Sequence, residues 1–112
     1  MKFYTVWQNN SGGYFIRNNA VDEYVCVQAS SPQEAEDKLS KITIDYSDFC
    51  ECCGERWGIW LNDGDGCEFI HDGYGNHIED LKDGVFVIYF ANGEKKKFNA
   101  SSQEYVSLDN WI

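Results

Sequence analysis

The residue types best suited to chemistry gather in one segment, Cys50-Glu51-Cys52-Cys53-Gly54-Glu55-Arg56-Trp57. Closely spaced thiols suit a metal site or a tight turn, a guanidinium suits a phosphate group, and an indole suits a flat ring. A second unusual segment is Asn9-Asn10-Ser11-Gly12-Gly13-Tyr14-Phe15. It offers amide side chains and glycine N–H groups, which can line a concave anion site. The two segments together hold the parts of a nucleotide-binding site.

A metal centre is the first use to consider for the thiols. Cys50 and Cys53 have CxxC spacing, and Cys67, His71 and His77 could complete a set of four ligands. No second CxxC or HxxxH pair exists in the chain, so the zinc pattern is incomplete. The alternative is a tight turn in which the thiols pack as small apolar groups.

Catalysis is not indicated, because no nucleophile stands in a recognisable relation to a base. Arg56 would lower the pKa of a nearby thiol, but Glu51 and Glu55 would oppose it. The spacing links neither histidine to a cysteine. We therefore expect no catalytic residues, no cofactor and no enzymatic activity.

A binding role for the two segments competes with plain structural roles. In the binding role, Asn9, Asn10, Ser11, Gly12 and Gly13 supply donors. Arg56 holds a phosphate, and Tyr14 or Trp57 stacks on a base. In the structural alternative, residues 9–13 form a hairpin turn, Trp57 belongs to the core, and Arg56 pairs with an acid such as Glu51. Both readings stay open on the sequence.

These residues must be positioned by strands and helices, and the order of those expected elements predicts an α+β fold. It should have an antiparallel sheet of five or six strands and one main helix. Ser31 is a suitable N-cap, Pro32 suits the first helical position, and Glu34 would complete a capping box. Lys95, Lys96 and Lys97 are typical of a protected sheet edge. The helix is expected at 32–42, and the strands at 2–8, 14–17, 24–28, 56–61, 67–71, 85–90 and 95–98.

Composition limits the partners and the location. The 112 residues suit a single domain spanning 1–112, and the net charge of −10 disfavours long DNA or RNA as partners. No apolar run is long enough to span a membrane and no basic leader is present, which predicts a soluble, cytoplasmic protein. Five cysteines, an odd number, argue against a disulfide framework.

The motifs QNNSGGYF at 8–15 and CCGxRW at 52–57, with a capped helix between them, resemble a widespread family of small bacteriophage proteins. The resemblance covers about the first half of the chain. It extends to phage immune-evasion proteins that counter the CBASS defence by sequestering cyclic dinucleotides such as 3′3′-cGAMP without cleaving them. That resemblance implies a homo-oligomer, with a tetramer as the expected form, acting in the infected host cell. The implied ligand residues are Asn9, Asn10, Ser11, Gly12, Gly13, Tyr14, Arg56 and Trp57.

An alternative function follows from the acidic region 45–83. Within it only Arg56 and Lys82 oppose many carboxylates. Such a surface could imitate the charge of DNA and inhibit a host defence or nucleic-acid enzyme by binding it. The commoner explanation of such a region is a solvated surface.

Overall fold

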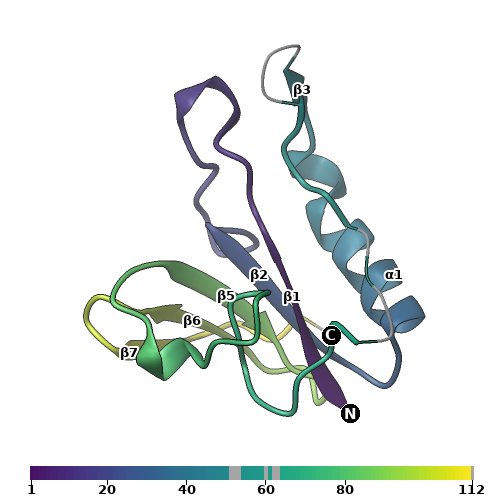
Figure 1. Ribbon diagram of the computed structural model, residues 1–112, viewed down its shortest axis with the longest axis vertical. Coiled ribbons are helices and arrows are strands. Elements are labelled where there is room, and N and C mark those ends of the chain that lie inside the picture. Colours follow the sequence, from purple (N-terminus) through teal and green to yellow (C-terminus); the bar gives the residue numbers. More distant parts are fainter. Residues whose placement is uncertain (51–53, 60, 62–63, 112) are drawn as a thin grey trace.

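The fold is built on a five-stranded sheet with the strand order β1-β2-β5-β6-β7. The computed structural model describes residues 1–50, 54–59, 61 and 64–111. Figure 1 shows the sheet beside the main helix α1 (Pro32–Thr43), which confirms the predicted α+β class. Two further strands, β3 (Phe49–Cys50) and β4 (Gly54–Glu55), form a separate antiparallel pair. The sheet strands are β1 (Lys2–Trp7), β2 (Tyr24–Ala29), β5 (Val85–Tyr89), β6 (Lys95–Asn99) and β7 (Glu104–Leu108).

The helix begins where the sequence predicts. Ser31 is the N-cap, and its hydroxyl accepts a hydrogen bond from the Glu34 N–H at 3.2 Å. The Glu34 carboxylate bonds to the hydroxyl and N–H of Ser30 rather than to the N–H of Ser31, so the capping box is not of the predicted form. The Ser30 hydroxyl, followed by Lys38, lowers the pKa of Glu34 to about 2.

Each face of the sheet carries its own core, because successive strand residues point to opposite sides. On one face, Val25, Val27 and Val87 pack with Ala35 and Leu39 of α1. The opposite core consists of Cys26, Ile78, Phe86, Ile88, Phe98 and Ala100. Ile70 and Leu81 also pack against this second core. The sheet is therefore covered by the helix on one side and by the segment around Ile78 on the other.

Strand pairing differs from the prediction in two places. Residues 14–17 form no strand, and β1 pairs with β2 instead, which places β1 at an edge of the sheet. β2 and β5 are parallel, so the sheet is mixed. The physical reason is the crossover through α1, since strands joined through a helix can align in the same direction.

Three further predictions about the strands are wrong. The three consecutive lysines do not protect an edge, because β6 lies between β5 and β7. No strand follows β4 in 56–59, and no strand occupies 67–71. There Cys67 bridges to Phe3, and His71 bridges to His77. Residues 60, 62 and 63 of the expected hairpin lie outside the described part of the chain. In that described part no helix is long and apolar enough to cross a membrane.

Candidate ligand-binding site

The two motif segments meet in space although about half the chain separates them. Gln8 and Trp57 form an antiparallel bridge. The Asn9 N–H donates to the Arg56 carbonyl at 2.7 Å, and the Asn9 side-chain amide donates to the Glu55 carbonyl at 3.3 Å. The end of β1 is thus joined through its backbone to the CCGxRW segment.

Arg56 is buried at this junction, with a relative exposure of 1%. Its Nε and Nη2 atoms bond to the two carboxylate oxygens of Asp48 at 2.9 and 3.1 Å. Its Nη1 donates to Gln8 Oε1 at 2.9 Å, to the Tyr14 carbonyl at 3.0 Å and to the Asn9 carbonyl at 3.3 Å. The guanidinium also lies 4.7 Å from the centre of the Tyr14 ring. Arg56 is therefore held by partners within the protein, which favours its structural role over the predicted phosphate contact.

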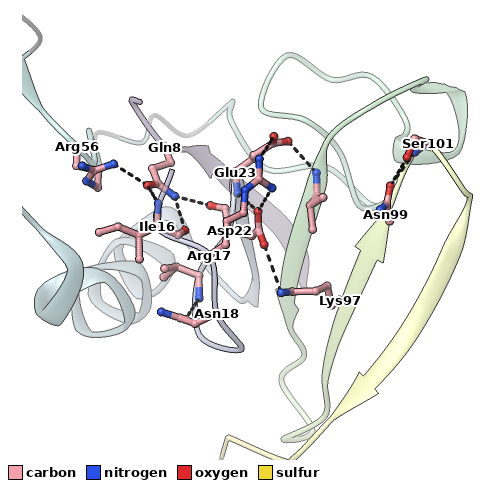
Figure 2. Close-up of polar contacts among 12 residues, drawn as sticks. Gln8, Ile16, Arg17, Asn18, Asp22, Glu23, Arg56, Lys97, Asn99 and Ser101 are labelled. Atoms are coloured by element: carbon pink, nitrogen blue, oxygen red, sulfur yellow. Dashed lines mark hydrogen bonds and ion pairs between the residues drawn. The ribbon is translucent and has the colours of Figure 1, made fainter. Parts of the chain in front are cut away.

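Gln8 links Arg56, Ile16 and Asp22 in Figure 2, and sequence reasoning missed it. Its Oε1 accepts from the Ile16 N–H at 2.7 Å and from Arg56. Its Nε2 donates to the carbonyls of Ile16 and Asp22, both at 3.0 Å. These bonds satisfy the buried amide and hold residues 14–17 near β1 without a strand. The signal in the sequence that could have identified this residue is a single glutamine at the end of an apolar run.

Trp57 lies mostly in the core, and the small part of it left exposed lines a hollow of about 310 Å³ together with Asp48 and Arg56. It is 5% exposed and belongs to the same cluster as Tyr4, Val6 and Leu39. Its indole N–H has no hydrogen-bond partner among the described residues. This burial favours the structural alternative for Trp57 over a role as a stacking platform for a ligand base.

The Asn/Gly segment is a short 3₁₀ turn, η1 (Ser11–Gly13). Gly12 and Gly13 have φ angles of 75° and 84°, which favour glycine. The Gly13 N–H already bonds to the Asn10 carbonyl at 2.9 Å and is therefore not aimed at a ligand. Asn10 and Tyr14 are exposed, whereas the side chain of Ser11 lies outside what the structure describes.

A hollow of about 560 Å³ opens at the junction, and we call it the motif hollow. Its walls include Trp7 and Phe15, with Asn9 and Asn10 at its side and Glu55 as its carboxylate. Trp7 is 49% exposed, which is unusual for a tryptophan. Four predicted residues therefore group here or next to it, namely Asn9, Asn10, Tyr14 and the buried Arg56.

A second hollow, of about 380 Å³, lies on another side of Trp7, and we call it the tyrosine hollow. Trp7 stacks on Tyr74 with ring centres 5.1 Å apart and planes at 21°. Tyr24 also lines this hollow, and burial, followed by the carboxylates of Asp72, Glu23 and Asp83, raises its pKa. The hollow is therefore aromatic and electronegative, which favours a flat or cationic group over a phosphate.

The predicted metal ligands do not assemble among the described residues, which contain no group of three or more His, Cys, Asp or Glu able to hold an ion. His71 is buried with both ring nitrogens engaged, Nε2 with the Phe3 carbonyl and Nδ1 with the Gly73 N–H, both at 3.0 Å. Cys67 is half-buried, and burial raises its pKa. Cys53 and the side chain of Cys50 lie outside the described part of the chain.

We expect His71 to make stability depend on pH. Burial lowers its pKa in the folded state, so the unfolded chain binds a proton that the folded chain resists. A proton on Nδ1 would also face the Gly73 N–H. Stability should therefore fall as pH drops below about 6.5, the ordinary histidine value. Urea unfolding at pH 7.5 and 5.5 should show a smaller difference in His71→Gln than in the natural chain. An equal pH difference in both would contradict this origin.

Fold and site together define a small α+β domain in which two distant segments build a braced, aromatic-walled junction at a sheet edge. The model of a domain of unknown function, DUF7296, matches residues 1–107, so the chain belongs to that family. No curated protein and no solved structure matches the chain significantly.

Proposed function

We propose that this chain is a non-enzymatic phage protein that binds a cyclic dinucleotide such as 3′3′-cGAMP and sequesters it in the cytoplasm of the infected cell. The observation that carries the proposal is the motif hollow, where the QNNSGGYF and CCGxRW segments meet beside an exposed tryptophan. Sequestration requires affinity and no chemistry, so the site needs only rings and donors.

The exposed ring of Trp7 and the half-buried ring of Phe15 perform the recognition in this proposal. A base stacks on Trp7 or Phe15, which is worth about 1–3 kcal/mol per base. The side-chain amide of the exposed Asn10 offers donors and acceptors to the base edge, while Asn9 is held by its bond to the Glu55 carbonyl and fixes the wall beside it. Arg56 acts indirectly, by holding the backbone at Asn9 and Tyr14 in place. A twofold-symmetric ligand is suited to a site shared between symmetric subunits, which is consistent with a homo-oligomer.

Trp7→Ala should weaken 3′3′-cGAMP binding about tenfold, because a stacking surface is lost. The measurement is titration calorimetry at moderate salt, followed by heat denaturation and chromatography of the released ligand. Tyr105→Ala, which also removes an exposed ring but from β7, is the matched control and should bind as the natural chain does.

Intact nucleotide in the heat-released fraction supports sequestration. A cleaved product would indicate a phosphodiesterase instead, and no binding would refute the proposal. Unchanged affinity in Trp7→Ala would place the ligand somewhere other than the motif hollow.

A second function, binding of a basic host protein, is favoured by the tyrosine hollow. Tryptophan and tyrosine are enriched at protein interfaces, and Trp7 and Tyr74 are exposed beside the carboxylates of Glu23 and Asp83. An acidic rim would steer a basic partner. This is the inhibitor role in which the acidic surface imitates DNA charge.

Capture of a host protein should then depend on this surface and on salt. The experiment compares the natural chain, Asp83→Lys and Trp7→Ala as bait at low and high salt, with Glu104→Lys on β7 as the charge-matched control. Loss of the same captured protein in Asp83→Lys and in Trp7→Ala, but not in Glu104→Lys, supports the interface. Equal loss in Glu104→Lys would show an unspecific charge effect and contradict it.

A further inference from the structure

A third hollow, of about 730 Å³, lies between α1 and the strands β5 and β6, and we call it the lysine hollow. Lys38 and Lys41 line it from the helix, and Lys95 lines it from β6. Tyr89 and Trp111 supply its aromatic surface. Three of the chain's nine basic residues therefore surround one hollow in a protein of net charge −10.

The three ammonium groups differ in how strongly they are already paired. Lys38 bonds to the Glu34 carboxylate at 2.9 Å and to the Gln28 carbonyl at 3.0 Å, which neutralises much of its charge. Lys41 and Lys95 form no ion pair with any carboxylate in the described ranges. These two lysines can therefore contact an anion without breaking an existing salt bridge.

The aromatic walls are held in fixed positions. The Trp111 indole N–H donates to the Phe90 carbonyl at 2.9 Å, and its backbone N–H donates to the Gly93 carbonyl at 3.1 Å. The Tyr89 hydroxyl donates to the Ala20 carbonyl at 2.6 Å. Lys38 Nζ lies 5.6 Å from the Trp111 ring centre, and Lys95 Nζ lies 5.5 Å from that of Tyr89. Rings fixed in this way lose little entropy when a ligand stacks on them.

We propose that the lysine hollow binds a nucleoside phosphate. Lys41 and Lys95 contact the phosphate oxygens through charge-assisted hydrogen bonds, and the half-buried Trp111 ring stacks on the base. The charge of this hollow is opposite to that of the tyrosine hollow, so it suits an anionic ligand. The inference does not depend on the proposed function, because it concerns other residues on other elements.

The test uses the full chain and titration calorimetry with ADP, adenosine and pyrophosphate at low salt. ADP should bind more tightly than either of its two parts. Lys41→Ala and Lys95→Ala should each weaken ADP binding about tenfold. Lys82→Ala removes an exposed lysine outside the hollow and should leave binding unchanged. Added salt should weaken ADP binding, because exposed ammonium groups are screened.

Several results would overturn the inference. Absence of ADP binding would refute it. If Lys82→Ala weakened ADP binding as much as Lys41→Ala does, the attraction would be unspecific. Equal affinity for ADP and pyrophosphate would show that the base makes no contact in the site. Trp7→Ala separates this site from the motif hollow, since ADP binding at the lysines should survive that change. Lys41 is exposed, so Lys41→Ala leaves the core intact and keeps the test interpretable.

Discussion

Arg56→Ala should lower the free energy of unfolding by about 2–5 kcal/mol, because buried oxygens lose their donor and the missing side chain leaves a cavity. The guanidinium is 1% exposed and bonds to Asp48, to the buried Gln8 amide and to the Tyr14 carbonyl. Without it, the Gln8 and Tyr14 oxygens lose a partner inside the protein, and a void forms beneath the motif hollow.

Denaturant unfolding of three variants tests this expectation. Arg17→Ala is the matched control, because Arg17 is about half exposed and its partner Asp22 keeps Lys97 at 3.3 Å (Figure 2). That control should cost about 1 kcal/mol or less. Asp48→Asn, at a half-exposed carboxylate, should cost less than Arg56→Ala. If Arg56→Ala unfolds like the natural chain and only ligand binding is lost, Arg56 is a ligand contact after all.

Trp57→Ala should also cost about 3–5 kcal/mol, because removal of a buried ring leaves a large cavity. Trp57→Phe should be much milder than the alanine variant. A phenyl ring keeps most of the packing with Val6 and Leu39, and it removes an indole N–H that is buried without a partner among the described residues.

The comparison of the two Trp57 variants by thermal and denaturant unfolding distinguishes packing from binding. Trp7→Ala serves as the control, since that tryptophan is 49% exposed and should cost far less stability. Two stable Trp57 variants that no longer bind 3′3′-cGAMP would contradict the assignment of this ring to the core.

Local signals in the sequence were sufficient for several elements. Ser31 and Pro32 specify the start of α1, because capping and the proline φ act over a few neighbouring residues. The apolar run at 85–90 predicts a strand buried on both faces, and β5 occupies Val85–Tyr89. The glycine-rich turn after Gln8 was also identified, since positive φ angles demand glycine.

Long-range pairing was not accessible in the same way. Residues 14–17 resemble a returning strand, yet the Gln8 side chain takes up the Ile16 backbone groups that a strand would have used. The consecutive lysines of β6 resemble the protected edge of a sheet, but β7 pairs with β6 and takes the edge position. The residues of β7 are mostly exposed and give no clear strand signal in the sequence. Such choices depend on contacts between residues far apart in the chain, which periodicity does not encode.

The sequence by itself determined the α+β class, the helix start, the strong negative charge and the two motif segments as an unusual pair. Only the tertiary structure decided what those segments do at their meeting point. Arg56 and Trp57 are neighbours in the chain, yet one is bonded to Asp48 and Gln8 and the other lies in the core. The exposed tryptophan beside the motif hollow is Trp7 and not Trp57. Lys41 and Lys95 place positive charge at the lysine hollow instead of at Arg56. The reason is that side-chain burial depends on which distant elements cover a residue, and that information appears only when the chain is folded.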